Sequence, residues 1–483
     1  MSSSHPSELT SWPLELLVSV ARNDSRPLSV QIEDQLRTAI RAGTLRPGTR
    51  MPSTRELARQ LGVSRPVVVD AYAQLAAEGY LVTRQGAHPR VSNAAALVEA
   101  GTTEPERPPA PRFDFRPSVP DLSAFPRTAW LRSVRAALSA LADDELGYGD
   151  LRGDERLRRA LAEYVGRVRG VVADPARIVV TNGYAQGRGL ACRALAAAGA
   201  RRIAIEDPSH PEQRATMSAA GLELVPVPVD EAGIRIDRLE AAAVHAVVLT
   251  PAHQYPSGAV LSGERRAALL RWLRDRDAIA IEDDYDAEYR YDRQPVGALQ
   301  GLEPERVVYA GSVSKTLAPA LRLGWLVVPD RLLDGVVYEK RLADLGTPRI
   351  DQHALADFIA RGELDRHLRR MRGRYRRRRD ALVGALAAAI AEAEIQGIAA
   401  GLHAAVRLPD GDDERAVVAE LRRRRVELAS LADYRMETGG PPTLLLGYAH
   451  APESTIRAGV AEIADAVGAT RVTSSRGRPR GRA

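Results

Sequence analysis

The sequence predicts an α/β protein with two folded parts: a small N-terminal helix-turn-helix unit, and a larger unit around a mixed, mostly parallel sheet. In the larger part, helical runs such as 263–276 alternate with apolar strand-like runs at 177–181, 202–206, 244–250, 278–282 and 306–310. Strands that are apolar on both faces are typical of a parallel sheet covered by helices. Residues 93–112, rich in Ala and Pro, predict a linker. We therefore expect domains at 1–92 and 113–470, joined by this linker and followed by a basic tail at 471–483.

Length and composition exclude several classes of protein. The 483 residues correspond to about three domains of ~150 residues, and 45% apolar with 27% charged residues is ordinary for a globular protein. The single cysteine, Cys192, excludes an internal disulfide and a cysteine-based zinc site, and its apolar neighbours predict a buried thiol. The first 30 residues show no export signal, and the longest uncharged stretch, 244–263, is too polar to span a membrane. We expect a cytoplasmic protein.

Residues 51–79 (MPSTRELARQLGVSRPVVVDAYAQLAAEG) predict two short helices separated by a turn. Ser53 and Glu56 form a capping box that would start the first helix, and Gly62 would end it. Ser64 would cap the second helix. This is the helix-turn-helix arrangement, in which the second helix enters the major groove of DNA. An earlier helix over 29–42 would pack behind the pair, and 80–92 would form a two-stranded wing.

Over residues 27–81 the motifs Leu-Arg-Pro-Gly, Pro-Ser-x-Arg-Glu-Leu-Ala and Leu-Gly-Val-Ser-Arg follow one another. This stretch resembles the winged helix of the GntR family, which implies binding to double-stranded DNA. By that resemblance the side chains that face DNA would be Arg50, Ser53, Arg55, Ser64 and Arg65. Physical chemistry agrees for Arg65, because side chains at the start of a recognition helix reach base edges and phosphates. The wing departs from the family's Gly-x-Gly-Thr-Phe, which leaves its minor-groove contacts open.

Of the 68 basic residues only two are lysines, Lys315 and Lys340. Lys315 follows Ser312 and Ser314 in a loop between two strand-like runs, with Arg322 nearby. A lysine that forms a Schiff base needs a neutral amine, and therefore a partly desolvated setting with hydroxyls and another cation close by. This loop fits that need, whereas Lys340 lies in a charged helical run and is expected at the surface.

Two further segments fit a cofactor that acts as an electron sink beside such a lysine. Residues 281–289 (IEDDYDAEY) place acids after an apolar strand, where a carboxylate could pair with a pyridinium nitrogen. Residues 179–189 (VVTNGYAQGRG) read as strand, glycine turn and helix, and the N–H groups of such a turn face an anion. The glycines match no nucleotide motif. Dense acids could also bind a metal, but no histidine accompanies them, so we expect no metal site.

These motifs occur in the order typical of fold-type I aminotransferases. They are Thr-Asn-Gly at 181–183, Glu-Asp-Pro at 206–208, TPAHQYPSG at 250–258, EDDYD at 282–286 and SVSKTL at 312–317. The wording HQYPSG and EDDYD, behind a GntR-type winged helix, resembles the MocR subfamily of GntR-type transcriptional regulators. The resemblance covers residues 27 to about 466.

The resemblance implies a fold-type I aminotransferase-like domain that holds pyridoxal 5'-phosphate covalently on Lys315. Asp283 would pair with the pyridinium nitrogen, and Tyr285 would bond the phenolic oxygen. The other residues implied at this site are Gly183, Tyr184, Ala185, Ser312 and Arg322 for the phosphate, His210 for stacking on the ring, His253 and Gln254 in the pocket wall, and Tyr148 from the partner subunit of a homodimer.

Two classes of function follow. A transcriptional regulator would use the aminotransferase-like domain for dimerisation and for sensing a small-molecule effector such as an amino acid, an amine or pyridoxal phosphate itself. The alternative is a pyridoxal phosphate-dependent aminotransferase with an appended DNA-binding domain. Such enzymes grip the substrate carboxylate with an arginine near the C-terminus, but the corresponding strand, 442–448, has none, and only Arg435 or Arg407 could replace it. This departure and the winged helix favour the regulator, with no catalytic residue assigned. A DNA-binding dimer with a vestigial cofactor site is a third possibility.

The net charge of +6 is unevenly distributed along the chain. Residues 471–483 carry five arginines and no acid, which suggests a polyanion partner. The Gly-Arg-Pro at 477–479 resembles an AT-hook, which lies in a narrow A·T-rich minor groove, and a merely solubilising tail is the alternative. The run 366–380 holds nine arginines and is expected to be a solvated helix face rather than a second DNA site.

Overall fold

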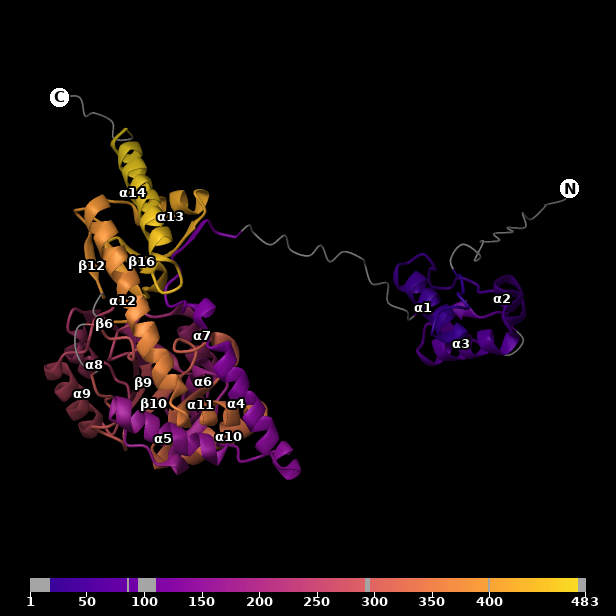
Figure 1. Cartoon of the computed structure of the whole chain (residues 1–483), viewed down its shortest axis with the longest axis horizontal. Helices are drawn as coiled ribbons and strands as arrows, with labels where there is room; N and C mark the ends of the chain where they lie inside the picture. The colour runs from indigo at the N-terminus through magenta and orange to yellow at the C-terminus, as the bar shows by residue number, and fades with distance from the viewer. Residues whose placement is uncertain (1–17, 85–86, 94–109, 292–295, 398–399, 477–483) are drawn as a thin grey trace. The chain divides into compact units, whose positions relative to one another are not determined.

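The computed structural model describes residues 18–84, 87–93, 110–291, 296–397 and 400–476 (Figure 1). The chain divides into two compact units, 1–109 and 110–483, which are considered separately. Within the described ranges, no helix is both long enough and apolar enough to cross a lipid bilayer. The AT-hook core suggested by the sequence lies outside the described residues.

The N-terminal unit is a bundle of three helices with a two-stranded wing. Its elements are α1 (Leu28–Arg41), α2 (Thr54–Leu61), α3 (Arg65–Ala77), β1 (Leu81–Val82) and β2 (Arg90–Val91). The predicted capping box is confirmed, because the Ser53 hydroxyl accepts from the N–H of Glu56 while the Glu56 carboxylate accepts from the N–H of Ser53. Gly62 ends α2 with φ +63°. Ser64 lies at the N-cap position of α3, but its side chain makes no capping hydrogen bond there.

An apolar core holds the second helix of the pair on a rigid support. Leu36 of α1, Leu57 of α2 and Val68 of α3 are buried together. The wing joins the same core, because β1 and β2 pair antiparallel with Leu81 opposite Val91, and both side chains are buried. The helix that would read DNA is therefore supported by every other element of the unit.

The C-terminal unit is built on an eight-stranded sheet in the order β4-β11-β10-β9-β8-β5-β6-β7. Its strands are β4 (Ile178–Thr181), β5 (Arg202–Asp207), β6 (Glu223–Asp230), β7 (Gly233–Ile234), β8 (Ala246–Leu249), β9 (Ile279–Asp284), β10 (Val307–Ser312) and β11 (Gly324–Val327). β11 is antiparallel to β10 and β4, and β7 turns back on β6, whereas the other neighbours are parallel. The mixed, mostly parallel sheet is confirmed, and the five predicted strands are β4, β5, β8, β9 and β10.

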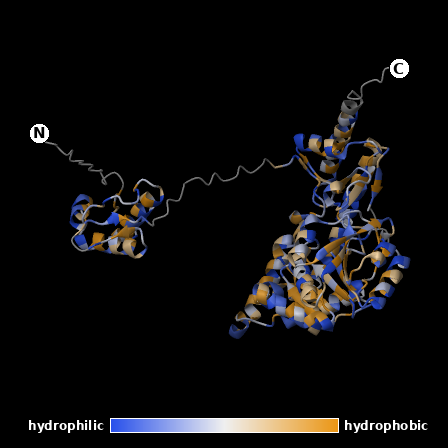
Figure 2. Cartoon of the chain, turned by 180° about the vertical axis from the view of Figure 1, so that it is seen from behind, coloured by the Kyte–Doolittle hydropathy of each residue, from blue (hydrophilic) through white to orange (hydrophobic). Residues whose placement is uncertain are grey.

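Helices cover both faces of this sheet. They are α4 (Arg127–Ala140), α5 (Glu155–Arg169), α6 (Tyr184–Ala197), α7 (Pro211–Ala219), α8 (Ile236–Ala241), α9 (Gly263–Asp275), α10 (Asp330–Asp344), α11 (Arg349–Ala360) and α12 (Glu363–Ala389). Alternate residues of a strand face opposite layers. Val179 of β4 packs in one cluster with α6 and α10, while Val180 packs in another with α5 and α11. Cys192 of α6 is fully buried in the first cluster, as expected. Figure 2 shows hydrophobic residues concentrated on the central strands.

A smaller antiparallel sheet, of which the sequence predicted only the strand at 442–448, follows α12. It contains β12 (Glu394–Gln396), β13 (His403–Arg407), β16 (Thr443–Gly447) and β15 (Ala429–Ser430), in that order. It is accompanied by α13 (Glu414–Arg423), α14 (Glu453–Arg476) and a strand pair of β3 (Phe113–Asp114) with β14 (Val426–Glu427). Short 3-10 turns complete the chain: η2 (Leu122–Ala124), η3 (Asp143–Leu146), η4 (Pro175–Arg177), η5 (Pro319–Leu321) and η6 (Leu431–Tyr434).

The boundary predicted for the basic tail is wrong. The tail was expected from residue 471, but α14 continues to Arg476. Arg471 is held by an ion pair with Asp412, in which both guanidinium–carboxylate bonds measure 2.8 Å, and by a second pair with Glu392. These partners lie about sixty and eighty residues away in sequence, so composition alone could not reveal them.

Several arginines of the run 366–380 also make contacts within the protein, whereas the sequence predicts a solvated helix face. Arg374 and Arg378 of α12 both pair with the buried Asp121, at 2.8 and 3.0 Å. Arg372 and Arg376 donate to the backbone carbonyls of residues 288 and 291. These side chains join α12 to the segments around it.

A buried ion pair joins α5 to the end of β9. The side chains of Arg169 and Asp284 are each 1% exposed, and the guanidinium donates to the carboxylate at 2.6 and 3.2 Å. Tyr309 of β10 adds a hydroxyl hydrogen bond of 2.7 Å to the same carboxylate. Because both charges are removed from water, each depends on the other.

We expect Arg169→Met to lower the free energy of unfolding by about 3–5 kcal/mol, because it would leave Asp284 buried without its cation. Chemical denaturation followed by circular dichroism measures this loss. Arg159→Met is the control, since Arg159 and Glu155 form a pair with side chains 69% and 62% exposed and exposed pairs contribute about 0–1 kcal/mol. Equal losses in the two variants would contradict the expectation.

Candidate functional site

The ends of four strands lie side by side at one edge of the large sheet. In the pairing of β9 with β10, Asp284 lies opposite Gly311, and in that of β10 with β11, Ser312 lies opposite Gly324. Gly324 also lies opposite Thr181, the last residue of β4. Ligands of open α/β sheets bind outside the carboxyl ends of the parallel strands. The acidic, serine-lysine and glycine segments singled out in the sequence all begin at this edge.

Two of the three consecutive acids that end β9 have close hydrogen-bond partners. The carboxylate of Glu282 accepts from the backbone N–H groups of Leu299 and Gln300, at 2.9 and 3.0 Å. That of Asp284 is paired with Arg169. Both side chains point to the same face of the sheet, because side chains two residues apart on a strand do so.

Asp283, between them, points to the opposite face of the sheet, where its carboxylate is more weakly hydrogen-bonded. Its carboxylate accepts a long hydrogen bond of 3.4 Å from Gln213, and the residue is 4% exposed. Burial raises the pKa of Asp283 to about 7, although the nearby Arg188 and the Tyr184 hydroxyl act in the opposite direction. A carboxylate so placed would be stabilised by a cation or by an N–H donor of a ligand.

Lys315 lies three residues beyond the end of β10 and is half-buried. Burial lowers the pKa of its amine below the usual value, and the carboxylates of Asp286 and Asp283 act in the opposite direction. The hydroxyl of Ser312, in the same loop, accepts a hydrogen bond from the N–H of Ser314. A lowered pKa increases the fraction of neutral, nucleophilic amine.

The turn between β4 and α6 has the features of an anion cradle. Gly183 has φ +80°, and a Cβ there would lie 2.8 Å from the guanidinium of Arg322. Arg322 donates to the carbonyl of Asn182 at 2.8 Å. α6 begins at Tyr184 and no described side chain caps it, so its first N–H groups, including that of the exposed Ala185, remain for an anion.

Aromatic rings form one wall of the site. His210 stacks on Tyr255, with ring centroids 5.8 Å apart and an interplanar angle of 23°, and meets the edge of Tyr434 at 5.7 Å. Burial lowers the pKa of His210, as do the charges of Arg188 and Lys315. The Nδ1 atom of His210 accepts from a backbone N–H of α7, so the ring is held as a neutral platform.

His253 joins this wall to the smaller sheet region. Its Nδ1 lies 2.9 Å from the Tyr285 hydroxyl and 3.0 Å from the Asp286 carboxylate, and its Nε2 lies 3.3 Å from the carbonyl of Gly397. Burial alone would lower the pKa of His253, but the carboxylate of Asp286 raises it above the usual value. Beside it, a Cβ on Gly258 would lie 2.3 Å from the Cα of Gly397, so the two loops touch through bare backbone.

Two residues implied at the cofactor site have other surroundings in this chain. The side-chain amide of Gln254 donates to the carbonyls of Pro208 and Tyr255, while its oxygen accepts from Ser257, so it holds its own loop together. Tyr148 is 90% exposed. Within a single subunit, the hydrogen bonds of Gln254 and the exposure of Tyr148 therefore do not direct either side chain to the cofactor site.

The arginines considered for a substrate carboxylate are already engaged. Arg407 forms ion pairs with Glu394 and Asp410. Arg435 donates to the carbonyl of Pro441 and lines a cavity of about 860 Å³. The strand expected over 442–448 is confirmed as β16, whose residues are buried and include no arginine.

The five residues implied at the DNA interface belong to the start of α2, the start of α3 and the segment before them. Arg50, Arg55, Ser64 and Arg65 are exposed and Ser53 is half-buried. Arg65 Nε lies 3.4 Å from the Thr54 hydroxyl, a bond that leaves most of the guanidinium open to solvent. Arg59, which was expected on a solvated face, is also exposed.

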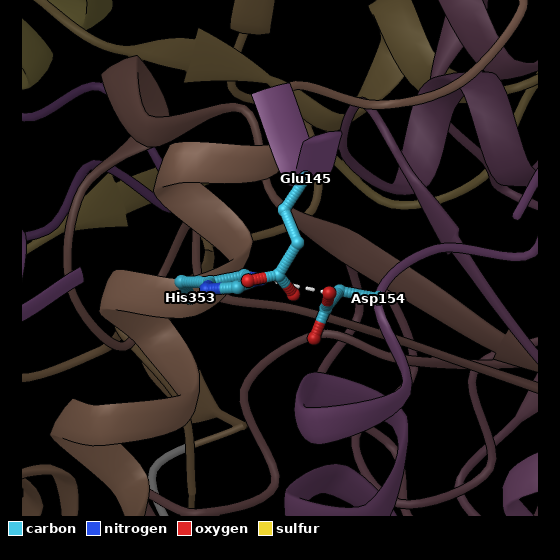
Figure 3. A group of neighbouring side chains, drawn as sticks. All are labelled: Glu145, Asp154 and His353. Atoms are coloured by element: carbon cyan, nitrogen blue, oxygen red, sulfur yellow. Dashed lines mark hydrogen bonds and ion pairs between the residues drawn. The ribbon is translucent and has the colours of Figure 1, made fainter. Parts of the chain in front are cut away.

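A group of side chains with metal-ligand chemistry lies elsewhere in the unit (Figure 3). Glu145, Asp154 and His353 converge, with His353 Nε2 2.7 Å from Asp154. Arg156 lies 3.0 Å from the other imidazole nitrogen and 3.3 Å from Glu145, and Arg349 lies 3.3 Å from Asp154. Because two guanidinium groups and the two engaged imidazole nitrogens already satisfy this group, we assign it a structural role.

Sequence reasoning missed several residues that shape the site. The acidic run of residues 282–286 ends at Asp286, whose role the motif does not indicate, although its spacing of two from Asp284 is the signal for a further buried carboxylate. Arg188, Gln213 and Tyr434 carried no motif, and they reach the site through α6, α7 and η6. Lys340 was expected at the surface, which is wrong, because its side chain is fully buried.

Two protein families match this chain, one in each unit. Residues 28–91 match the family described as "Bacterial regulatory proteins, gntR family", and residues 123–457 match "Aminotransferase class I and II". The chain belongs to the MocR-type GntR regulators, which join these two domains, and it is a DNA-binding transcriptional regulator with an aminotransferase-like domain.

Particular relatives match along nearly the whole chain. The HTH-type pyridoxine biosynthesis transcriptional regulator PdxR of Corynebacterium glutamicum is 34% identical over 93% of this chain and 98% of its own. The probable rhizopine catabolism regulatory protein MocR of Rhizobium meliloti is 32% identical over 91% and 93%. The crystal structure of a multiple substrate aminotransferase from Thermococcus profundus is similar with a TM-score of 0.69, at 25% identity over 75% of this chain and 92% of that one.

The raised pKa of Asp283 predicts a pH dependence of stability in the cofactor-free protein. The folded protein holds this proton up to about pH 7, whereas an unfolded chain releases it near pH 4. The favourable contribution is therefore present at low pH and is lost as the pH rises from about 4 to about 7. Asp283→Asn cannot titrate, so we expect it to reduce this loss by on the order of 3 kcal/mol.

Urea unfolding at a series of pH values between about 4.5 and 7.5 measures the difference from the unsubstituted protein. Asp237→Asn is the control, because hydrogen bonding from Arg235 lowers the pKa of Asp237 to about 2, so its contribution changes only below this range. Parallel stability curves for Asp283→Asn and the unsubstituted protein would show that Asp283 is already ionised.

Proposed function

We propose that this regulator binds pyridoxal 5'-phosphate covalently through Lys315, and that its aminotransferase-like domain senses a small-molecule effector rather than turning over a substrate. The observation that carries the proposal is the buried carboxylate of Asp283. Its partners among the described residues are a long hydrogen bond from Gln213, the Tyr184 hydroxyl and the nearby charge of Arg188. It shares the sheet edge with a lysine of lowered pKa and with an uncapped helix start. A pyridinium nitrogen, a carbonyl carbon and a phosphate on one molecule match these three features.

The residues present fit this cofactor. Asp283 would hold the ring nitrogen by a charge-assisted hydrogen bond, and the Tyr285 hydroxyl, oriented by His253, would face the phenolic oxygen. His210 would support the ring face. The phosphate would lie on the turn of Gly183, Tyr184 and Ala185, beside Ser312 and Arg322. When bound, the cofactor supplies an electrophilic carbon that reacts with primary amines.

The surroundings of Arg407 and Arg435, the two arginines that could bind a substrate carboxylate, favour effector sensing over catalysis. An amino acid is fixed in a catalytic pose by a bidentate arginine fork. Arg407 forms exposed ion pairs with two acids, and Arg435 donates to a backbone carbonyl in a cavity that Glu437 also lines. Among effectors, an amino acid, an amine and pyridoxal phosphate itself fit the reactive carbon or the site. The name of the C. glutamicum relative, which refers to pyridoxine biosynthesis, favours the last.

A homodimer is supported by exposed apolar side chains on two helices of the C-terminal unit. Leu131 and Leu138 are 49% and 52% exposed on α4, and Tyr338 and Leu342 are 60% and 66% exposed on α10. Each pair lies on one helix face, because seven or four residues separate its members. A second copy of the chain would cover these faces, and we place the exposed Tyr148 in the partner's cofactor site.

The N-terminal unit would bind double-stranded DNA with α3 in the major groove. Ser64 and Arg65, at the start of α3, would meet bases and phosphates, while Arg50, Ser53 and Arg55 would contact the backbone of the DNA. A protein that binds an operator acts where the genome is, so we expect this regulator to act in the cytoplasm.

We expect Lys315→Ala to abolish the visible absorption band that appears when the cofactor-free protein is mixed with pyridoxal phosphate, because the covalent bond is lost. Lys315→Arg is the matched control, since it keeps the positive charge but forms no such bond, and it should lose the band as well. A band that persists unchanged would place the covalent bond elsewhere. If the unsubstituted protein showed no band, the cofactor proposal would fail, and rapid transamination of common amino acids would favour the enzyme instead.

We expect Arg65→Ala to weaken binding to the operator by about 1–3 kcal/mol, and binding to random DNA by less, because a side chain at the start of the recognition helix reads bases. Fluorescence anisotropy with both DNAs measures the two losses. Arg59→Ala, on the exposed face of α2, is the control and should leave the ratio of the two affinities unchanged. Equal losses on both DNAs would reassign Arg65 to a phosphate contact.

A further inference from the structure

Lys340, near the end of α10, is a buried cation with a dedicated set of acceptors. Its side chain is 0% exposed, and its amine donates to the two carboxylate oxygens of Asp344 at 2.9 and 3.2 Å. A third bond of 2.9 Å goes to the hydroxyl of Thr347. An ammonium group is costly to bury unless its hydrogen bonds are satisfied. All three donors of Lys340 are satisfied here.

The carboxylate of Asp344 extends this network to the turn between β4 and α6. It accepts from the side-chain amide of Asn182 at 2.9 Å and from that of Gln186 at 2.7 Å. Gln186 in turn accepts from the backbone N–H of Asn182 at 2.7 Å. Asn182 is therefore held by both its backbone and its side chain, and it immediately precedes Gly183.

The same turn is held from the opposite side by β11 and the segment before it. Arg322 donates to the Asn182 carbonyl, and a Cβ on Gly324 would lie 2.9 Å from the carbonyl carbon of Gly183. The turn thus has contacts on one side from β11 and on the other from α10. N–H groups that bind an anion act best when their directions are fixed in advance.

We propose that Lys340 and Asp344 are positioning residues that hold the Asn182–Gly183 turn in the shape that receives the phosphate of the cofactor. The inference rests on the proposed cofactor site and adds to it a support that does not itself touch the ligand. Lys340 fixes the Asp344 carboxylate, and Asp344 fixes Asn182 and Gln186. Gln186 lies on the first turn of α6, so the N–H groups at its start are oriented together with the turn.

The alternative is a purely structural ion pair that stabilises α10 against α6. The two helices are also joined by a second pair, Arg193 of α6 with Glu339 of α10, at 2.8 Å. Glu339 is the residue next to Lys340, but its partner lies near the other end of α6, away from the turn. Glu339→Gln therefore serves as a matched control for loss of an α6–α10 contact.

The experiment titrates the cofactor-free full-length protein with pyridoxal 5'-phosphate and, separately, with pyridoxal, which lacks the phosphate. The change in absorbance on binding measures the affinity for each of the two ligands. We expect Lys340→Met and Asp344→Asn to raise the dissociation constant for pyridoxal phosphate roughly tenfold, the scale on which residues that support a ligand-binding group act. Affinity for pyridoxal should change by less than about twofold, and Glu339→Gln should change neither value, because the phosphate turn keeps its supports.

Equal weakening for the two ligands, or an unchanged affinity for pyridoxal phosphate, would overturn the inference and leave the ion pair a structural one. If Lys340→Met does not fold, Asn182→Ala tests the same prediction. It removes the side chain that donates to Asp344 at the half-exposed turn, and it should weaken binding of pyridoxal phosphate but not of pyridoxal. In the double variant Asn182→Ala/Asp344→Asn the combined loss should be less than the sum of the two single losses, because both substitutions remove the hydrogen bond between Asn182 and Asp344. An unsubstituted protein that binds the two ligands equally would instead refute the proposed phosphate site.

Discussion

The burial of three consecutive carboxylates at the end of β9 is the constraint around which the C-terminal unit is arranged. Each carboxylate loses water and must be compensated. Glu282 takes two backbone N–H groups from the segment after it, and Asp284 takes Arg169 from α5 and Tyr309 from β10. The alternation of the strand turns Asp283 to the other face, where its partners are a long hydrogen bond from Gln213, the Tyr184 hydroxyl and the nearby charge of Arg188. Two of these neighbouring acids thus have structural partners, and for the third, Asp283, we propose a role in binding the cofactor.

Local sequence patterns predicted what depends on local interactions. The capping box at Ser53 and the positive φ of Gly62 follow from a few neighbouring residues, and both were predictable. The parallel strands were also predictable, because burial on both faces leaves an uninterrupted apolar run such as that of β9. The motifs at their carboxyl ends could be assembled into one site because parallel strands end at a common edge.

Features that depend on distant partners were not predictable. Lys340 was assigned to the surface because Glu339 and Arg341 surround it in sequence, yet its neighbour in space is Asp344, one helical turn later, and that spacing of four was the available signal. Apart from β16, the small antiparallel sheet consists of strands of two to five residues, which are too short for alternation to be read. Arg471 shows the same limit, since only the folded chain brings Asp412 to it.

The contact between Gly258 and Gly397 has a consequence for how the two sheet regions of the C-terminal unit can move. Side chains usually form the layer between packed segments, and a change of rotamer can absorb a small displacement. Here the two backbones touch directly, and even one added carbon would lie 2.3 Å from the opposite Cα. No adjustable layer exists at this seam, which lies beside His253. At this point the small sheet region cannot be pressed any closer to the larger one.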